Sequence, residues 1–539
     1  MIKNKAARII SVLIVLSLAA GLCSCAAADY ISSAVGRLTS SADEKPNEDG
    51  ESAEDDTARE ISNDITVGII DYDTFNPLWT ASQTVKDVCG FIYEPLFGID
   101  STMRTMGVLA ESYIIGADGA SLIIKLKQGV LWHDGTELCA DDVIYTVNTI
   151  REGNTRYTSF TEPITGIWKE DNYTVCVSFS RSVPDSVSLF IFPIVKNKSL
   201  YSGKQDFIPV GTGPFRYVSS NGATYLEAFE QHHDGRAQLD RVNIEFLTDL
   251  GKYRSLFNAN ELDMADSEML DMSTFMPKSN SNVTDYTSNT MVFAGFNTSN
   301  PKLSGALTRQ AISLLTDRDE IVTNIYYSRA VASDYAINPQ SWLSFETRTK
   351  LRADTWSAAQ LFAQDGWTAD SRGIYYKQIG GKLTYLTVSV LVNSDSGQRV
   401  AVAEQLAQWL NGNGIIAKVN ACDYKQFNAM IAADNYEMFV GETELLPNND
   451  MTGLAGSAGN YFNYADSETD TLLWQLGTVQ LESDVQSVSN RLYERIHTET
   501  PFAPICFLKK SLVTGAKIKS GFNPSIQGFV RETEKWTVK

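Results

Sequence analysis

The stretch "LAESYIIGADGASLIIKLKQGVLWHDGTELCADDVIYTV" (residues 109–147) decides the fold, because it joins a strand pattern to the start of a helix. Leu122, Ile124 and Leu126 recur at every second position, which predicts a half-buried strand. The apolar residues that follow "CADD" fall on one helical stripe, and they are Val143, Ile144, Val147 and Ile150. Similar short strands and helices alternate from Ile65 onward, which indicates a mixed α/β chain.

His133 and Asp134 are neighbours in this stretch, in a chain with only four histidines, and they raise the question of a catalytic relay. Neighbouring side chains of a strand point to opposite faces, whereas a dyad needs both groups within hydrogen-bond reach. We therefore interpret Asp134-Gly135 as a turn in which Gly135 takes a positive φ. His133 is predicted to pack as scaffold, and Asp141 and Asp142 suit a helix N-terminus.

Other catalytic and metal-binding patterns are also missing from the sequence. His232, His233 and His497 lack HExxH-type spacing. "HHDG" (232–235) offers two metal ligands, but adjacent histidines in a turn usually lie in water. The chain contains neither a GxSxG elbow nor a Walker loop, since "GTGPF" (211–215) lacks the terminal Lys-Ser/Thr. We predict no catalytic residue, no metal ligand, no cofactor and no enzymatic activity.

The bulk composition describes a soluble globular protein that does not bind nucleic acid. A chain of 539 residues is long enough for two or three domains, and its formal net charge of −20 opposes binding to phosphates. Residues 41–60 contain nine acidic side chains and few apolar ones. We interpret residues 26–61 as a disordered acidic tether.

The N-terminus has the features of an export signal. Three basic residues precede an apolar run from Ile9 to Leu22, which is too short to span a bilayer comfortably. The run ends in "LCSC", which resembles a bacterial lipobox with Cys25 as the lipidated residue. We predict a lipoprotein signal peptide at 1–25, with a plain cleaved secretory signal as the alternative. No other stretch is long and apolar enough to cross a membrane.

The remaining cysteines are widely spread and odd in number, which suits neither a zinc pattern nor an obvious disulfide framework. At most two disulfides are possible, and buried free thiols are favoured. These cysteines are Cys89, Cys139, Cys176, Cys422 and Cys506.

Several stretches together resemble one known family. They are, in chain order, "FIYEPLFGID" (91–100), the stretch 109–147, "VGTGPFRYV" (210–218), "FNTSNPKLSGALTRQAISLLTDRDEI" (296–321), "AAQLFAQDGW" (358–367) and "LAQWLNGNGIIAKV" (406–419). Their order and content are similar to the extracellular solute-binding proteins of family 5, the peptide, nickel and related substrate-binding components of ABC importers. The hairpin and helix at 109–147 are the most specific match, and the six blocks cover nearly the whole folded chain.

The resemblance implies a type II periplasmic-binding-protein fold with two hinged α/β lobes and an extra domain, three domains as in cluster C. By this analogy lobe I comprises 62–96, 208–286 and 503–539. The extra domain II is 97–207, and lobe III is 287–502.

The resemblance also implies a ligand site in a cleft between the lobes. Peptide-binding members hold the ligand ammonium with an aspartate, but our alignment places Leu445 at that position, so the peptide assignment is weakened. Nearby acidic residues could replace it, although this segment could equally be a solvated acidic loop. The candidate ligand-binding residues are Phe75, Asn76, Trp79, Gln83, Glu442, Glu444, Asp450, Asn460 and Tyr461.

The sequence thus predicts a monomeric substrate-binding lipoprotein of an ABC importer, anchored outside the membrane. It would capture peptides or a related small solute and deliver it to permease and ATPase subunits. The alternative is a non-transport sensory or surface-binding protein on the same fold.

Overall fold

The computed structural model of the chain describes residues 63–538 except 154, 200–206, 221, 268, 271–280, 345–351 and 522. Residues Ser62–Lys539 form one compact unit. The predicted signal peptide (1–25), the lipidated Cys25 and the acidic tether (26–61) lie outside the described residues. The predicted division of 62–539 into lobes and an extra domain stays a prediction.

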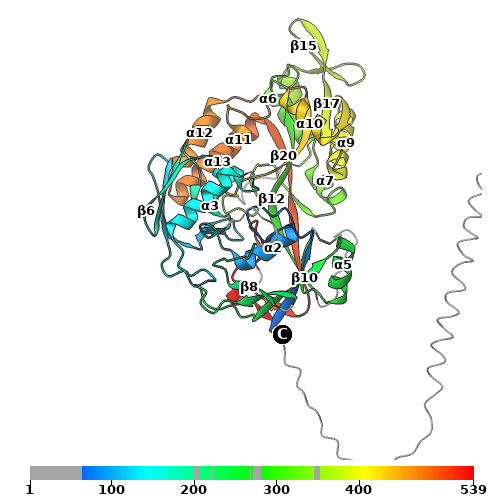
Figure 1. Cartoon of the computed structure of the whole chain (residues 1–539). Helices are drawn as coiled ribbons and strands as arrows, with labels where there is room; N and C mark the ends of the chain where they lie inside the picture. The colour runs from blue at the N-terminus through cyan, green and yellow to red at the C-terminus, as the bar shows by residue number, and fades with distance from the viewer. Residues whose placement is uncertain are drawn as a thin grey trace, which may run out of the picture. The chain divides into compact units, whose positions relative to one another are not determined.

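Two long antiparallel strands, β12 (Asn282–Phe296) and β20 (Phe502–Thr514), form the centre of the largest sheet (Figure 1). The order in this sheet is β11-β20-β12-β19-β17-β18, and β13 also pairs with β20. The other strands are β11 (Met264–Asp266), β13 (Ala330–Ala332), β17 (Thr387–Asn393), β18 (Ile416–Cys422) and β19 (Met438–Glu444).

Both faces of this sheet are covered, because side chains alternate along its strands. Met291 and Phe293 of β12 pack into one apolar cluster, whereas Val292 and Ala294 pack into another. Figure 1 shows α7 and α9 on one side of the β12–β20 pair and α12 and α13 on the other. Burial on both faces explains why these strands are apolar throughout much of their length.

Two four-stranded sheets complete the main framework. One has the order β1-β10-β9-β8, with β1 parallel to β10, and joins β1 (Asp64–Ile70), β8 (Phe215–Ser220), β9 (Ala223–Ala228) and β10 (Arg241–Leu247). The other is antiparallel, with the order β4-β5-β7-β6, and joins β4 (Ala110–Ile115), β5 (Ser121–Leu126), β6 (Ile164–Asp171) and β7 (Thr174–Phe179). One continuous apolar core contains residues of both sheets.

The smaller sheets are β2-β3, β14-β15-β16 and β21-β22. Their strands are β2 (Phe97–Ile99), β3 (Thr105–Gly107), β14 (Thr368–Ala369), β15 (Tyr375–Ile379), β16 (Lys382–Tyr385), β21 (Ile518–Ser520) and β22 (Thr537–Val538). The helices are α2 (Gln83–Ile92), α3 (Ala140–Glu152), α4 (Thr158–Thr161), α5 (Leu250–Ala259), α6 (Ala306–Leu314), α7 (Arg318–Asn324), α8 (Thr355–Gln364), α9 (Gly397–Gly412), α10 (Tyr424–Ala432), α11 (Thr452–Ala455), α12 (Ser467–Thr478), α13 (Glu482–Glu499) and the 3₁₀ turns η1 (Ser186–Phe190) and η2 (Thr533–Lys535).

Local sequence explains where many of these helices begin. A serine or aspartate side chain accepts a hydrogen bond from a backbone N–H three residues later, which satisfies an amide that has no partner inside the helix. These N-cap residues are Ser82, Asp249, Asp317, Asp354, Ser396, Asp423 and Asp466.

The predicted strand and helix of residues 109–147 are confirmed as β5 and α3. Val143, Val147 and Ile150 are fully buried, while Ile144 is only partly buried. The family-like block at 296–321 contains α6 and the start of α7.

Two buried arginines explain the "RQAI" and "DR" parts of the sequence. The Arg309 guanidinium donates to the carbonyls of Thr500 and Glu499, at the C-terminal end of α13. Arg318 donates to the Pro504 carbonyl at 2.8 Å and forms an ion pair with buried Asp334. Both guanidiniums therefore tie helices to the start of β20.

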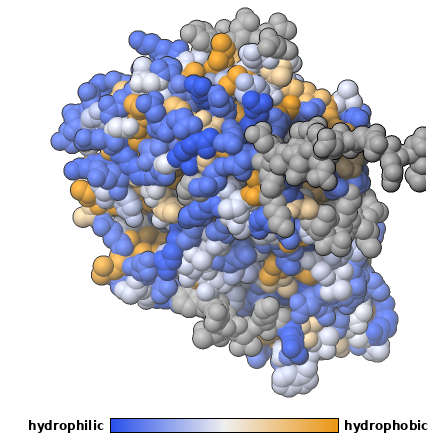
Figure 2. All heavy atoms as spheres, turned by 90° about the horizontal axis from the view of Figure 1, so that it is seen from below, coloured by the Kyte–Doolittle hydropathy of each residue, from blue (hydrophilic) through white to orange (hydrophobic). Residues whose placement is uncertain are grey.

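The cysteines Cys89, Cys139, Cys176, Cys422 and Cys506 are free, and all except partly exposed Cys139 are buried. The expectation of buried free thiols is confirmed for those four. The face of the molecule in Figure 2 is mostly hydrophilic, with apolar residues in small separate groups. Within the described residues, none of the helices is long and apolar enough to span a membrane.

The β12–β20 pair contains a bulge between Thr287 and Met291, where the register shifts. Asn338 is buried beside it, and its amide group donates to the carbonyls of Thr287 and Ser288, at 3.4 and 3.0 Å. A bulge leaves backbone groups without ladder partners, so this side chain replaces the missing partners.

We expect Asn338→Ala to lower the free energy of unfolding by about 1–3 kcal/mol, because buried carbonyls lose their donor. Urea denaturation measures this change. Asn435→Ala, at an exposed position, is the matched control and should change the free energy by less than about 0.5 kcal/mol. Equal effects of the two substitutions would contradict the role assigned to Asn338.

Candidate functional site

A cavity of about 290 Å³ runs along α2. Its wall combines α2, the segment 526–533 near the C-terminus, and residues of β11, β12 and β20. Figure 1 shows α2 beside β12 and β20 in the middle of the view. The cavity therefore lies where segments from the beginning, middle and end of the chain meet.

α2 has one polar face toward the cavity and one apolar face toward the core. Gln83, Lys86, Asp87 and Gly90 line the cavity, at the i, i+3, i+4, i+7 spacing of one helical stripe. The opposite face is buried in the large core and comprises Val85, Val88, Phe91 and Ile92. At Gly90 a Cβ atom would lie 3.1 Å from the Val530 Cβ, so a glycine lets the C-terminal segment pack against α2.

Charged groups gather at the end of the cavity next to the long strands. Tyr286 of β12 and Lys510 of β20 are directly opposite in the strand register. The Tyr286 hydroxyl lies 3.5 Å from an oxygen of Asp266, which is on β11. On α2, the Gln83 side chain donates to the Asp87 carboxylate at 2.9 Å.

Burial dominates the protonation of the two α2 residues at this end. It lowers the pKa of Lys86, and neighbouring Arg156 and Lys510 lower it further. Burial raises the pKa of Asp87, and the charge of Asp266 adds to this effect. Both ionised forms are thus destabilised, so a solute that supplies opposite charges to them would be stabilised in return.

The other end of the cavity contains Glu94, His232 and Asp234. Burial alone would raise the pKa of Glu94, but hydrogen bonds to His232 and His233 lower it to about 2. The carboxylate of Glu94 is therefore ionised at neutral pH. The expectation that the two histidines lie in water is wrong, because their side chains are only 5 and 7% exposed.

His133 and Asp134 contact different partners. His133 Nδ1 accepts from the Gly211 N–H at 3.2 Å, and Nε2 lies 2.8 Å from the Gly213 carbonyl. The ring therefore links the turn after β5 to the "GTGPF" segment. Asp134 accepts from the backbone N–H of Thr136, and Gly135 has a φ of +83°, as predicted for the turn.

The predicted lobe I residues take different positions. Gln83 lines the cavity. Phe75 is buried against Tyr217, with ring centroids 5.4 Å apart. The Asn76 side chain accepts from the Leu78 N–H at 3.1 Å and so shapes its own loop, while Trp79 is 44% exposed.

The predicted acidic residues are also dispersed. Glu442 forms an ion pair with Arg399 at 3.1 Å, and nearly buried Asp450 pairs with Arg181. Glu444, at the end of β19, is close enough to raise the pKa of Lys86. Of these three, Glu444 is thus the one that interacts with the charged end of the cavity.

Asn460 and Tyr461 belong to a loop that precedes α12. The Asn460 side chain donates to two carbonyls of the loop, those of Gly456 and Tyr464, each at 2.7 Å. Tyr461 is 57% exposed. The assignment of all nine candidates to the ligand site stays a prediction.

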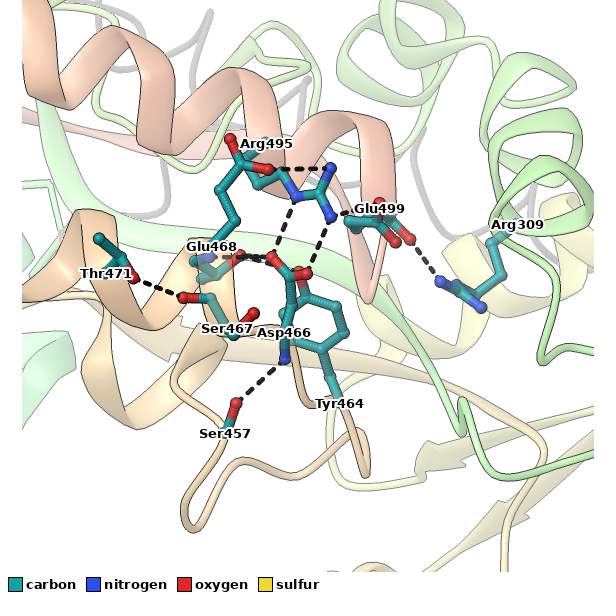
Figure 3. A network of polar contacts seen from close by, with 10 residues as sticks. Arg309, Ser457, Tyr464, Asp466, Ser467, Glu468, Thr471, Arg495 and Glu499 are labelled. Atoms are coloured by element: carbon teal, nitrogen blue, oxygen red, sulfur yellow. Dashed lines mark hydrogen bonds and ion pairs between the residues drawn. The ribbon is translucent and has the colours of Figure 1, made fainter.

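The loop is fixed to α13 by the polar network in Figure 3. Asp466 accepts two hydrogen bonds from Arg495, at 2.8 and 3.0 Å, and its N–H donates to the Ser457 hydroxyl. Arg495 also pairs with Glu499 at 3.1 Å. Hydrogen bonds from Arg495 lower the pKa of Asp466, so this network holds the loop while the carboxylate is ionised.

Sequence reasoning missed most of the charged end, namely Lys86, Asp87, Asp266, Tyr286 and Lys510. The polar stripe of α2 was the available signal, since Gln83, Lys86 and Asp87 share one helical face. This stripe lies on a helix that the sequence analysis does not predict.

Residues 105–463 match the family model described as bacterial extracellular solute-binding proteins, family 5 Middle. The oligopeptide-binding protein AppA of Bacillus subtilis is 22% identical over 508 residues, which cover 88% of this chain and 91% of the relative.

Solved structures resemble the chain over the same extent. AppA of Bacillus subtilis in complex with a nonapeptide has a TM-score of 0.60 at 20% identity and covers 88% of this chain and 99% of its own. HbpA2 of Haemophilus parasuis has a TM-score of 0.75 at 18% identity and covers 88% of this chain and 100% of its own. These likenesses confirm the predicted α/β fold of type II periplasmic binding proteins.

The surroundings of His133 generate a pH-dependent prediction. Burial lowers the pKa of His133 to about 4, whereas an unfolded histidine titrates near 6.5. The neutral ring therefore stabilises the fold fully above pH 6.5, and this contribution is lost as the pH falls toward 4.

We expect the wild type to be more stable than His133→Gln at pH 7. The difference in free energy of unfolding should shrink by about 2–3 kcal/mol between pH 7 and pH 4. Urea denaturation at four or five pH values measures it. A difference that stays constant over this range would show that His133 does not carry the predicted pH dependence.

Proposed function

Because the chain belongs to the family 5 bacterial extracellular solute-binding proteins, we propose that its cavity binds a peptide or a related small solute with both an amino and a carboxylate group. The family places the protein outside the cytoplasm as a solute-binding component of ABC importers. The observation that carries the proposal is that two lysines and two aspartates line one end of the cavity, namely Lys86, Lys510, Asp87 and Asp266.

The charges at this end suit a zwitterion. Lys86 and Lys510 offer partners for a carboxylate, and Asp87 and Asp266 offer partners for an ammonium group. Burial destabilises the charged forms of Lys86 and Asp87, so an occupant with matching charges recovers the hydration energy that these two residues lose. The similarity to an oligopeptide-binding relative supports the same class of solute.

The cavity supports binding rather than catalysis in this proposal. His133 is engaged by two backbone groups of the "GTGPF" segment, so it serves as scaffold. Family 5 members are transport proteins, and we propose that this chain likewise releases its solute unchanged to permease and ATPase subunits. Domain closure would follow because only a closed state contacts the solute from both lobes.

We also propose that the mature protein is a monomer anchored through a lipid on Cys25, with residues 26–61 as a tether between anchor and lobes. One acyl chain alone gives weak membrane binding, so a stable anchor needs the multiple chains of a bacterial lipoprotein. The alternative function is a sensory or surface-binding protein on the same fold, without a transporter.

Solute binding is tested by calorimetry with trialanine and with two blocked forms, N-acetylated and C-amidated. We expect free trialanine to bind with a Kd of about 1 μM, equivalent to about −8 kcal/mol. Each blocked form should bind at least tenfold more weakly, because one charge is lost. Equal affinities for all three forms would contradict the recognition of a zwitterion.

Substitutions locate this binding at the charged end. Lys86→Met and Asp87→Asn should each weaken trialanine binding at least tenfold, since each removes one charge partner. The matched controls are Lys382→Met and Asp370→Asn. Both residues lie on or near β15 and β16, away from the cavity. Both control variants should bind trialanine as the wild type does. Unchanged binding in both cavity variants would remove this site from consideration.

Lipid attachment is tested by metabolic labelling with radioactive palmitate in a bacterial host. Cys25→Ser should abolish labelling and release the protein from the membrane fraction, because the acceptor thiol is lost. Cys23→Ser is the control and should still be labelled. Labelling that survives Cys25→Ser would show that the anchor is elsewhere.

The ATPase activity of the transporter distinguishes a role in import from the sensory alternative. An importer component should stimulate the ATPase activity of the permease complex encoded beside its gene when solute is present. A gene without such neighbours would favour the sensory alternative.

A further inference from the structure

Three Lewis bases converge at the end of the cavity opposite the charged cluster. Glu94 follows α2 directly, and His232 and His233 lie in the turn after β9. One ligand atom from each residue lies within 4.8 Å of the others. The side chains of Glu94, His232 and His233 are 12, 5 and 7% exposed, so bulk water does not separate them.

The same nitrogen, Nε2, of each ring faces Glu94. His232 Nδ1 lies 3.1 Å from the Gly235 carbonyl, and His233 Nδ1 lies 3.1 Å from an Asp234 carboxylate oxygen. The Gly235 carbonyl only accepts, so His232 carries a hydrogen on Nδ1. Both Nε2 atoms approach the Glu94 carboxylate at 3.1 Å, so each can exchange its hydrogen bond to Glu94 for a bond to a metal ion.

This arrangement calls for positive charge between the three groups. Protonated rings supply it in the metal-free protein, because each Nε2–H then donates to Glu94, but two protonated rings would place two cations with ring centroids 4.5 Å apart in a buried site. One divalent metal ion supplies the same charge and uses all three groups as ligands.

The distances from Glu94 to the two histidines fit a tetrahedral ion, and the ligand atoms of all three residues lie within 4.8 Å of one another. Metal–ligand bonds of about 2.0–2.1 Å separate neighbouring ligand atoms by roughly 3.3 Å, so contacts of 3.1 Å need to open by only a few tenths of an ångström. Imidazole and carboxylate ligands suit Zn²⁺ and its neighbours Co²⁺ and Ni²⁺. The Nδ1 contacts with the Gly235 carbonyl and the Asp234 carboxylate involve the types of group that usually orient metal-binding histidines.

We propose that Glu94, His232 and His233 bind one divalent transition-metal ion, with Zn²⁺ as the reference ion and the fourth position open to the cavity. Three protein ligands plus an open position is the arrangement of accessible zinc sites. Glu94, His232 and Asp234 line the cavity, so a ligand in the cavity has access to that position. The site departs from the sequence-based prediction of no metal, and it stands whether or not the cavity binds a zwitterionic solute.

The test is calorimetric titration of the chelator-treated, full-length chain with Zn²⁺. We expect the double variant His232→Ala/His233→Ala to lose one equivalent of Zn²⁺ relative to the wild type, and Glu94→Gln to weaken that equivalent at least tenfold. Asp234→Asn keeps all three ligands and should weaken it about 10- to 100-fold. Cys23 and Cys25 are present in every variant, so any ion that they bind cancels in the comparison.

His497→Ala is the control, because His497 lies on α13 and stacks on Tyr335, away from the cavity. It should bind Zn²⁺ as the wild type does. Replacement of Zn²⁺ by Co²⁺ adds a direct readout, since the visible spectrum of a tetrahedral Co²⁺ site should appear in the wild type and be absent from the double variant.

Equal stoichiometry and affinity in the wild type and the double variant would overturn the proposal. Circular dichroism identifies a variant that fails to fold, in which case Asp234→Asn and the Co²⁺ spectrum of the wild type decide. Trialanine binding by Lys86→Met and Asp87→Asn reports on the solute proposal separately, so either proposal can fail alone.

Discussion

The antiparallel pairing of β12 with β20 is the constraint on which the rest of the structure depends. These strands are the longest of the central sheet, and β11, β13 and β19 all pair with one or the other. Their register places Tyr286 opposite Lys510, although the two residues are more than two hundred positions apart. Because side chains alternate along a strand, a slip of one residue in either strand would move its own residue to the other face and take it away from the charged end of the cavity.

The bulge after Thr287 refines this constraint. A bulge bends its strand and increases the local twist, and this one lies between Tyr286, at the charged end, and the buried residues from Met291 onward. Asn338 holds the bulge by donating to carbonyls that lack ladder partners. The buried pair Arg318–Asp334 then connects the same region to β20 through the Pro504 carbonyl. Backbone hydrogen bonding thus determines where the charged groups are presented.

The sequence alone predicted those features that depend only on residues close together in the chain. The stretch 109–147 predicted β5, the turn at Gly135 and α3, because alternation, turn residues and helix capping are local. The scaffold role of His133 followed from the same local argument, and its partners in the "GTGPF" segment gave it a physical reason. The blocks that resemble family 5 extended this success to the type II fold.

The cavity was less accessible to sequence reasoning, because its residues come together only through tertiary structure. Lys86 and Lys510 face one cavity from opposite ends of the chain, and Glu94 meets His232 across 138 positions. Two adjacent histidines in a turn suggest a solvated loop. The sequence does not show that the Glu94 carboxylate lies beside them in the fold. Predicted candidates such as Asn76 and Asn460 proved to shape their own loops, which polar residues of turns commonly do.

α2 connects the two chemically distinct ends of the cavity, and its sequence explains how. Its apolar face is buried in the large core, which fixes the helix, while Lys86 and Asp87 face the cavity and Glu94 follows its last turn. A rise of 1.5 Å per residue separates Lys86 from the C-terminal end of the helix by roughly 10 Å. An extended chain of three residues spans about the same length. A peptide of that size, with its charged terminus at Lys86 and Asp87, therefore has the reach to place its far end beside Glu94 and the two histidines. If both proposals hold, metal and peptide would occupy one continuous site, and each would change the affinity for the other by the same factor.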